Sequence, residues 1–190
     1  MSVKFDYQFT KSGWAEGLIS LGKKRLDFKV NYFSDPLGDL LGSLVAITPG
    51  YAEMDFSTEK PVDLAEFDWK GEPEAYEWTM VNRGGNKLDI EILMASDWMG
   101  GSNSRESVLK GSCNFSAFLK EVTDSSTLLL QRHGFVGYSN SWGNGKDFPI
   151  VNLLKLKYYL AHQTVQEVKN EEGALYFSSF SEEIESLKKS

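Results

Sequence analysis

The sequence predicts an α+β fold in which an antiparallel sheet of about six or seven strands carries helices on one face. Three observations predict this class: strand-like alternation opens the chain, a longer alternating hairpin follows, and helical apolar spacing dominates the second half. The length of 190 residues suits one core. We therefore expect residues 1–172 to form a single domain and residues 173–190 a C-terminal appendage.

The first elements are expected to be a β-meander over residues 3–9, 14–20 and 25–33. Alternate residues in its first and third segments are apolar, as half-buried strands require: Val3, Phe5, Tyr7 and Phe9, then Leu26, Phe28, Val30 and Tyr32. A helix should follow, because Ser34 or Asp35 can cap it and Pro36 suits its first turn. Residues 51–62 lack a clear pattern and are expected to form a loop with some extended structure, before a strand at 64–69.

The longest alternation, over residues 74–96, predicts one long β-hairpin. Its apolar positions are all even-numbered, so they share one face only if an odd-length connection joins the strands. We therefore expect a connection of three or five residues with a glycine at positive φ, which sets Met80 opposite Leu88 or Ile90.

The second half should contain one more strand, at 107–113, and two long helices. Asn114 can cap the first helix, which should run to about His133 and stop at Gly134. The second should run from Ile150 to about Val168, with residues 137–147 between them as a loop. For the core, we expect the helices to pack on the sheet through Leu40, Leu41, Leu44, Phe118, Leu119, Val122, Leu153 and Leu154, against Phe5, Phe28, Val30, Trp78 and Ile90.

The composition limits the function classes. A net charge of −7 and a pI near 4.9 argue against nucleic acid as a partner, because phosphate binding needs a basic surface. No apolar run approaches the roughly 20 residues of a membrane span, and the first residues lack the layout of a signal peptide. The single cysteine excludes an intramolecular disulfide. We expect a cytoplasmic protein that does not bind a membrane.

The sequence predicts no catalytic, cofactor-binding or metal-ligating residue. His133 and His162 are expected to be surface or helix-end residues, and Cys113 a buried thiol. The segment Gly143-Asn144-Gly145-Lys146 lacks the spacing of a phosphate loop. Carboxylates are abundant, but strand alternation puts them at regular spacing on any solvated face.

Residues 137–148 mix aromatic and small polar side chains, a composition typical of recognition surfaces. We expect an interaction surface there, and its candidate residues are Tyr138, Asn140, Trp142, Asn144, Lys146 and Asp147. The other interpretation is that these aromatic side chains close the end of the sheet. If Trp142 is buried and structural, an aromatic cleft between sheet and helices becomes the better hypothesis.

One resemblance accompanies this pattern. The residues that carry it are Asp35-Pro36-Leu37-Gly38-Asp39-Leu40-Leu41, then Trp69, Glu72-Pro73, Tyr76 and Trp78. In these residues the chain resembles a group of small bacterial single-domain proteins with no assigned activity. The resemblance covers residues 3–92 and the helix after Cys113, and residues 51–62 look like an insertion. It implies a bacterial, single-domain protein and gives no residue a role.

These observations favour a non-enzymatic interaction protein that binds a basic protein partner, for example an immunity-type protein that occludes a toxin. The acidity and the lack of a catalytic motif support this hypothesis. The alternative is a small-molecule or peptide binder that uses an aromatic cleft. A hydrolase built on carboxylates is the third hypothesis.

Overall fold

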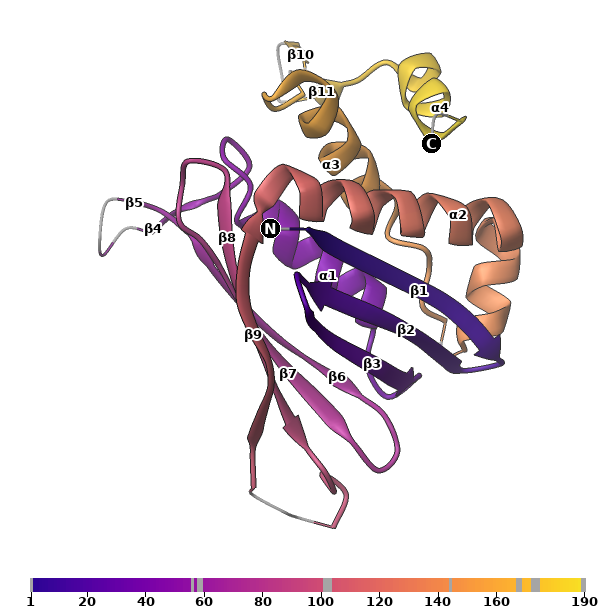
Figure 1. Ribbon diagram of the computed structural model, residues 1–190. Helices are drawn as coiled ribbons and strands as arrows, with labels where there is room; N and C mark the ends of the chain where they lie inside the picture. The colour runs from indigo at the N-terminus through magenta and orange to yellow at the C-terminus, as the bar shows by residue number, and fades with distance from the viewer. Residues whose placement is uncertain are drawn as a thin grey trace.

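The computed structural model describes residues 2–55, 57, 60–100, 104–143, 145–166, 169–171 and 175–188. It confirms the predicted α+β class (Figure 1). The main strands, all antiparallel, form a three-stranded sheet ordered β1-β2-β3 and a four-stranded sheet ordered β6-β7-β8-β9. The predicted strand number is thus reached by two sheets.

The three-stranded sheet is the predicted meander, built from β1 (Val3–Lys11), β2 (Trp14–Leu21) and β3 (Lys24–Asn31). Helix α2 runs along the free edge of β1 (Figure 1). The N–H of Phe5 donates to Glu121 Oε2 (3.4 Å), and the N–H of Tyr7 donates to Ser125 Oγ (3.0 Å). The helix therefore takes up donors that an exposed edge strand would offer to other chains.

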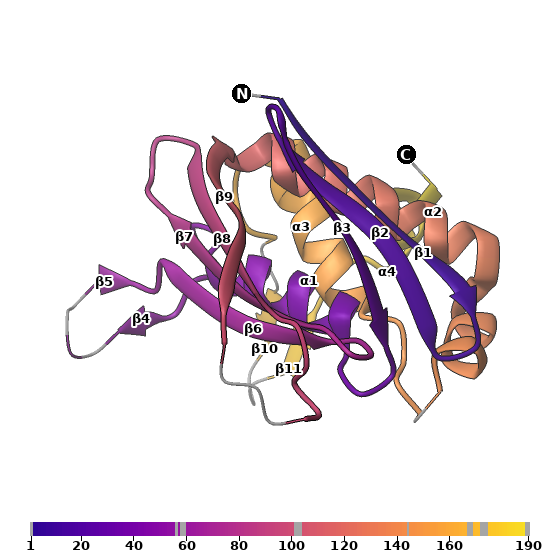
Figure 2. The ribbon, with the colours of Figure 1, turned by 60° about the horizontal axis from the view of Figure 1, so that its bottom comes forward.

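Helix α1 (Pro36–Ala46) begins where the sequence predicts, with Asp35 as its cap. The carboxylate of Asp35 accepts a hydrogen bond from the N–H of Gly38 (3.2 Å). A Cβ on Gly38 would overlap that carboxylate, so a larger residue at this position would force the capping side chain to shift. The buried face of α1 packs against β6 and α3, and Figure 2 shows α1 between the two sheets.

The four-stranded sheet contains the predicted hairpin. Its strands are β6 (Leu64–Lys70), β7 (Ala75–Asn82), β8 (Lys87–Ala95) and β9 (Glu106–Asn114). Met80 lies opposite Ile90, and five residues separate the paired Asn82 and Leu88. Gly84 and Gly85 have φ of 72° and 55°, so both the register and the positive-φ turn are confirmed. Before this sheet, residues 51–62 hold a small hairpin, β4 (Met54–Asp55) with β5 (Lys60–Pro61).

Helix α2 (Phe115–Trp142) corrects one prediction. Asn114 caps it as expected, since its side chain accepts from the N–H of Ala117 (2.9 Å). Gly134 leaves the helical region with φ 66° and ψ 174°, which confirms a break at this residue. The chain then resumes a helix through Trp142, so residues 137–142 are not the predicted loop.

Helix α3 (Ile150–His162) is shorter than predicted, because Gln163 turns left-handed at φ 56° and ends it. Its buried residues are Leu153, Leu156 and Tyr159, so Leu154 is only partly buried. The chain continues through the short strands β10 (Lys169–Glu171) and β11 (Leu175–Phe177) to α4 (Phe180–Lys188), which contacts α3. The domain limit at residue 172 stays a prediction.

The core lies between the sheets and the helices. All predicted core residues except Leu154 are buried. Trp78 stacks on Phe67 with ring centroids 5.5 Å apart, and the indole rings of Trp69 and Trp78 lie 4.6 Å apart. Among the described residues, no helix is both long and apolar enough to cross a membrane.

Candidate functional site

The structure divides the predicted interaction surface. Asn140, Lys146 and Asp147 are exposed, whereas Tyr138 and Trp142 are 0% exposed. Asn144 lies outside the described residues. The expectation that Tyr138 and Trp142 are surface anchors is therefore corrected.

The burial of these two side chains follows from the helix that replaces the predicted loop. Residues four apart share one helix face, so Tyr138 and Trp142 point the same way, toward β1. Both rings pack against the ring of Phe9, at centroid distances of 5.2 Å for Tyr138 and 5.5 Å for Trp142. Phe148 packs edge-on against Tyr138 at 5.2 Å. The rings fill the space between sheet and helices that the alternative hypothesis assigns to a cleft.

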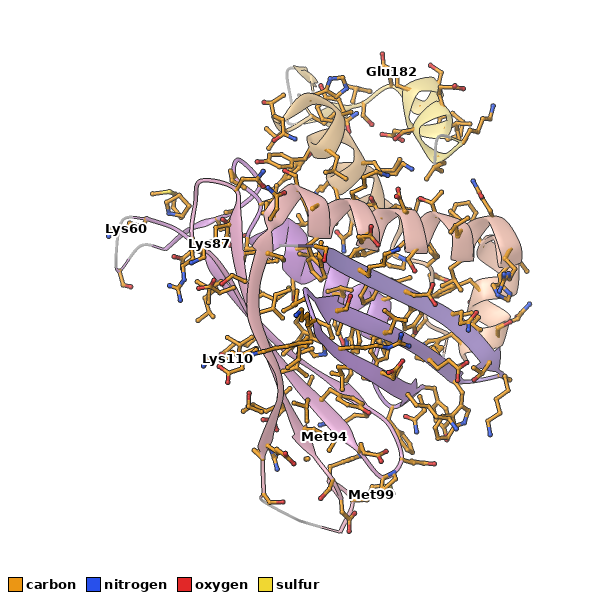
Figure 3. All side chains as sticks on the ribbon, viewed as in Figure 1. Lys60, Lys87, Met94, Met99, Lys110 and Glu182 are labelled. Atoms are coloured by element: carbon orange, nitrogen blue, oxygen red, sulfur yellow. The ribbon has the colours of Figure 1, made fainter. Side chains whose placement is uncertain are left out.

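A different group of aromatic side chains is exposed in part, with two exposed rings and one partly buried ring. Tyr32 and Phe33, directly after β3, are 39% and 46% exposed, and Trp98 lies in the β8–β9 connection. The ring centroids of Tyr32 and Phe33 are 4.8 Å apart, and those of Phe33 and Trp98 are 5.9 Å apart. We call Tyr32, Phe33 and Trp98 the aromatic platform. Figure 3 shows the neighbouring Met99 at the end of the four-stranded sheet.

Hydrogen bonds from separate segments hold the aromatic platform in place. The N–H of Tyr32 donates to the carbonyl oxygen of Gly13 (3.0 Å), in the β1–β2 turn. The indole N–H of Trp98 donates to the carbonyl oxygen of Gly71 (2.8 Å), in the β6–β7 turn. The ammonium of Lys70 lies 5.1 Å from the centroid of the Trp98 ring. The platform is therefore preorganised, which lowers the entropic cost of binding.

Two carboxylates follow the platform residues Tyr32 and Phe33 in the sequence, at the cap and in the first turn of α1. We call Asp35 and Asp39 the carboxylate pair; both are partly buried. The N–H of Lys70 donates to Ser34 Oγ (2.9 Å), which ties the chain before Asp35 to the strand below the platform. Neither carboxylate forms an ion pair within the part of the chain that the structure describes.

The electrostatics of the carboxylate pair are unusual for this molecule. Burial raises the pKa of Asp35, and the Gly38 N–H and the Lys146 charge lower it in part. Burial, followed by repulsion from Asp35, raises the pKa of Asp39 to about 6; Asp68 adds to the increase, and the Asp35 N–H and Lys146 oppose it. The structure thus brings the predicted residue Lys146 near both carboxylates. At neutral pH the pair carries negative charge, and it forms no ion pair with a described residue.

Carboxylates on the outer face of the four-stranded sheet behave differently. Three of them have a cation as partner: Glu77 with Arg105 (2.6 Å), Glu91 with Lys110 (2.7 Å) and Asp89 with Arg83 (2.8 Å). Hydrogen bonds from Lys110 to Glu91 and from Ser112 to Asp89 hold both carboxyl pKa values below their usual range. A general acid needs a raised pKa, so these residues do not suit the hydrolase hypothesis. Asp35 and Asp39 have raised values but lie on one helix rather than across a cleft.

The other candidates for chemistry are structural. Cys113 is buried, as predicted, and burial raises the pKa of its thiol to about 11. His133 packs against Phe9 with ring centroids 5.1 Å apart, and His162 packs against Tyr158 at 4.3 Å. Within the described ranges, no three His, Cys, Asp or Glu side chains gather in a way that holds a metal ion.

A groove of about 460 Å³ lies between α3 and α4. Leu154, Tyr158 and Ala161 supply apolar surface from α3, and Glu182 supplies charge from α4. It lies at the C-terminal end of the chain, as the position of Glu182 in Figure 3 shows, rather than between sheet and helices. It is therefore not the cleft of the alternative hypothesis.

Comparisons with known proteins found no matching family model, and neither a curated protein nor a solved structure with a significant match.

The sequence contained a signal for the aromatic platform that pattern reading missed. Tyr32 and Phe33 are adjacent at the end of a strand, where successive side chains point to opposite faces. At least one of them therefore could not face the core. The contribution of Trp98 had no such signal, because it depends on contacts with residues far away in the sequence.

Proposed function

We propose that this protein is a binding module that docks a basic segment of another protein on the aromatic platform and the carboxylate pair. The observations that carry the proposal are that the exposed rings of Tyr32 and Phe33 directly precede Asp35 in the sequence, and that Asp35 and Asp39 form no ion pair with a described residue. An immunity-type protein that occludes a basic toxin is one concrete form of this function. A gene for such a toxin beside the coding gene would support it.

The two parts of the surface contribute differently to binding. Aromatic side chains supply most of the energy at protein interfaces, so Phe33 and Trp98 would act as anchors. Acidic residues attract a basic partner over a longer range and increase the association rate. The net charge of −7 adds to that attraction.

The alternative function, small-molecule or peptide binding in an aromatic cleft, has less support. Phe9, Tyr138, Trp142 and Phe148 pack against each other where that cleft would open. The aromatic platform lies outside this cluster, with Tyr32 and Phe33 after β3 and Trp98 in the β8–β9 connection.

A random-peptide display library, selected on the full chain, tests the proposal. We expect the enriched peptides to be rich in lysine and arginine, and to lose at least about tenfold in affinity for Phe33→Ala, as interface anchors do. Phe180→Ala is the matched control, because Phe180 is 74% exposed on α4. It should bind like the wild type.

The association rate separates the two parts of the surface further. Asp39→Asn should slow association of the selected peptides at low salt, and the difference should shrink at high salt. The loss caused by Phe33→Ala should persist. Enrichment of neutral or acidic peptides, or equal binding to Phe33→Ala and wild type, would contradict the proposed function.

A further inference from the structure

Strand β3 forms one edge of the three-stranded sheet, opposite the edge of β1 along which α2 lies. In an antiparallel pair, the backbone N–H and C=O groups of successive residues point alternately toward the partner strand and away from it. On β1, Phe5 and Tyr7 point away from β2, because their N–H groups donate to side chains of α2. This direction determines which residues of β3 point outward.

The register carries the alternation across the sheet. Tyr7 lies opposite Gly17, and Gly17 lies opposite Phe28. Because Tyr7 points away from β2, the backbone of Gly17 points toward β3, and that of Phe28 points back toward β2. The odd-numbered residues of β3, among them Arg25 and Asp27, therefore direct their N–H and C=O groups to the free edge.

Other parts of the fold occupy both ends of this edge. At its start, Lys24 Nζ donates to the carbonyl oxygen of Lys110 in β9 (2.7 Å). At its far end, the carbonyl oxygen of Lys29 lies against Gly71 of the β6–β7 turn, where an added Cβ would overlap it. The edge of β3 thus extends from β9 to the β6–β7 turn.

The backbone between these two ends is open. The N–H and C=O groups of Arg25 and Asp27 have no hydrogen-bond partner among the described residues. A groove of about 590 Å³ lies at this edge, lined by Arg25, Asp27 and Lys29 of β3 and by Glu74 and Tyr76 of the predicted hairpin. Its remaining lining comes from β1 and β2. An unpaired strand edge of this kind pairs with another extended segment.

One face of an added strand would meet apolar surface. Tyr76 lies on the same face of β7 as the buried Trp78, and Met94 lies opposite Tyr76 on β8. The four-stranded sheet extends beyond β3 (Figure 1), and Figure 3 shows Met94 on this extension. Side chains that point inward from the added strand would therefore face Tyr76 and Met94.

The other face would meet negative charge. Four carboxylates and two cations line the groove, and one of the cations, Arg25, already pairs with Asp27. The carboxylates of Asp6, Glu16 and Glu74 form no ion pair within the part of the chain that the structure describes. This face of the groove is complementary to basic side chains.

We infer that an extended, basic segment of another protein adds to the edge of β3 as an antiparallel strand. Its backbone pairs with Arg25 and Asp27, its basic side chains lie on the outer face, and its alternate apolar side chains face Tyr76 and Met94. Antiparallel pairing continues the direction of this sheet and is slightly more stable per residue than parallel pairing. The inference goes beyond the proposed function, because the groove contains no residue of the aromatic platform or the carboxylate pair among its described lining.

The first test uses the full chain and a short peptide of alternating lysine and valine. The control is a peptide of the same composition with its lysines and valines in two blocks. Isothermal titration calorimetry should show at least about tenfold tighter binding of the alternating peptide, because only this peptide matches the two faces of the groove. Equal affinities of the two peptides would show attraction by charge alone and overturn the inference.

Backbone N-methylation of the alternating peptide tests the pairing itself. In the antiparallel arrangement, lysines lie opposite Arg25 and Asp27, so the lysine N–H groups point toward β3. Methylation of the lysine backbone nitrogens should weaken binding at least about tenfold, whereas methylation of the valine nitrogens should leave it unchanged. The reverse result would indicate a parallel strand and overturn the antiparallel pairing. Equal effects would overturn strand addition.

A pair of variants tests the same bond from the protein side. Asp27→Pro removes the N–H that points to the free edge, a place where strands tolerate proline. Asp27→Asn is its matched control, because it also loses the charge and the ion pair with Arg25 but keeps the N–H. The proline variant should bind the alternating peptide at least about tenfold more weakly than the asparagine variant. Circular dichroism checks that both fold, and if the proline variant does not, the methylated peptides on the wild type decide.

Hydrogen exchange of the wild-type amides provides an independent readout. Without peptide, the N–H groups of Arg25 and Asp27 should exchange faster than those of Phe5 and Tyr7, which donate to α2. The alternating peptide should slow the exchange at Arg25 and Asp27. If both amides are already protected and lose their protection on dilution, a second copy of the chain occupies the edge, and the inference is overturned.

The outcomes separate this inference from the proposed function. Phe33→Ala should bind the alternating peptide like the wild type, because Phe33 does not line the groove. If the alternating peptide binds and no library peptide depends on Phe33, the strand site exists and the docking function of the platform is wrong. If library peptides depend on Phe33 and the alternating peptide does not bind, the platform function stands and this inference is wrong.

Discussion

The molecule contains two aromatic clusters that look similar in the sequence and occupy opposite environments. Tyr138 and Trp142 are followed by small polar residues and glycines, as at many recognition surfaces, yet both are fully buried. Tyr32 and Phe33 end an ordinary alternating strand, yet both are exposed and form the platform with Trp98. Local composition therefore predicted the interaction surface at the wrong one of these two aromatic clusters.

The backbone explains the difference between the two clusters. A four-residue spacing within a helix puts Tyr138 and Trp142 on one face, and α2 packs that face on Phe9. Tyr32 and Phe33 follow β3, where the chain turns toward the cap of α1. Whether these aromatic side chains are exposed thus depends on the backbone conformation of the segment that carries them. Local amino-acid composition does not indicate that conformation.

The largest expected effect comes from the buried cluster. Trp142→Ala should lower the free energy of unfolding by about 3–5 kcal/mol, because it removes a fully buried ring and leaves a cavity against Phe9. Chemical denaturation followed by circular dichroism measures this change. A loss below about 1 kcal/mol, the range of surface substitutions, would place Trp142 with the exposed cluster and break the comparison.

The second prediction concerns the break that orients the buried cluster. Gly134→Ala should destabilise the fold by about 1–3 kcal/mol, because φ 66° with ψ 174° is a region that only glycine adopts easily. Apart from Gly134 itself, its chain neighbours and the nearby helix backbone, no atom of the described residues lies within 4 Å of the added Cβ, so the cost is a backbone cost.

Gly137→Ala is the matched control for that substitution. Gly137 lies in the resumed helix, and an added Cβ would meet His133 Cβ at an ordinary 3.7 Å. Alanine should therefore stabilise the fold by about 0.5–1 kcal/mol. Equal effects of the two substitutions in thermal unfolding would show that Gly134 does not set the direction of the helix.

The fold could be predicted further from the sequence than the site could. Alternation fixes which face of a strand is buried, so the register of Met80 with Ile90 followed from parity alone. Capping residues indicate where helices begin, as Asp35 and Asn114 do. The predicted helix ends were less accurate. Gln163 ends α3 in a left-handed conformation, which is usually adopted by glycine, so the sequence contains no signal for it.

The candidate site depends on contacts between distant segments. Trp98 contacts Phe33 although the two residues are 65 positions apart in the sequence. The sequence around either residue contains no motif that would indicate this contact. The spacing of Asp35 and Asp39 was visible in the sequence, but the raised pKa of Asp39 was not, because it depends on burial and on where Asp68 and Lys146 lie in the fold. Lys146 was predicted as a surface residue for a different reason.

The third prediction sharpens the contrast through pH. The pKa of Asp39 is about 6 in the fold. An unfolded aspartate titrates near about 4, so the folded chain binds more protons between these values. The free energy of unfolding should then fall as pH rises through this window and level off above it. Asp39→Asn cannot ionise and should be more stable than the wild type at neutral pH, by about 1 kcal/mol after allowance for solvent screening.

Urea denaturation at a series of pH values measures that difference. The two proteins should have similar stability near pH 4, a value about equal to the unfolded pKa, and diverge as pH rises. Asp6→Asn, on the exposed side of β1, serves as the control for net charge. A gap between wild type and Asp39→Asn that stays constant with pH would show that the carboxylate pair is fully solvated.

The smallest expected effect belongs to the aromatic platform. Phe33→Ala should change the free energy of unfolding by no more than about 0.5 kcal/mol, because surface substitutions remove little buried area. Phe33 is 46% exposed, and its ring contacts those of Tyr32 and Trp98. Both of these residues would keep their own hydrogen bonds to the carbonyl oxygens of Gly13 and Gly71. Denaturation of Phe33→Ala beside Trp142→Ala measures both clusters under one set of conditions. A loss of several kcal/mol for Phe33→Ala would mean that the platform is a structural plug, and its exposure would then no longer argue for binding. A near-silent substitution that still weakens the selected peptides would separate binding from folding in these rings.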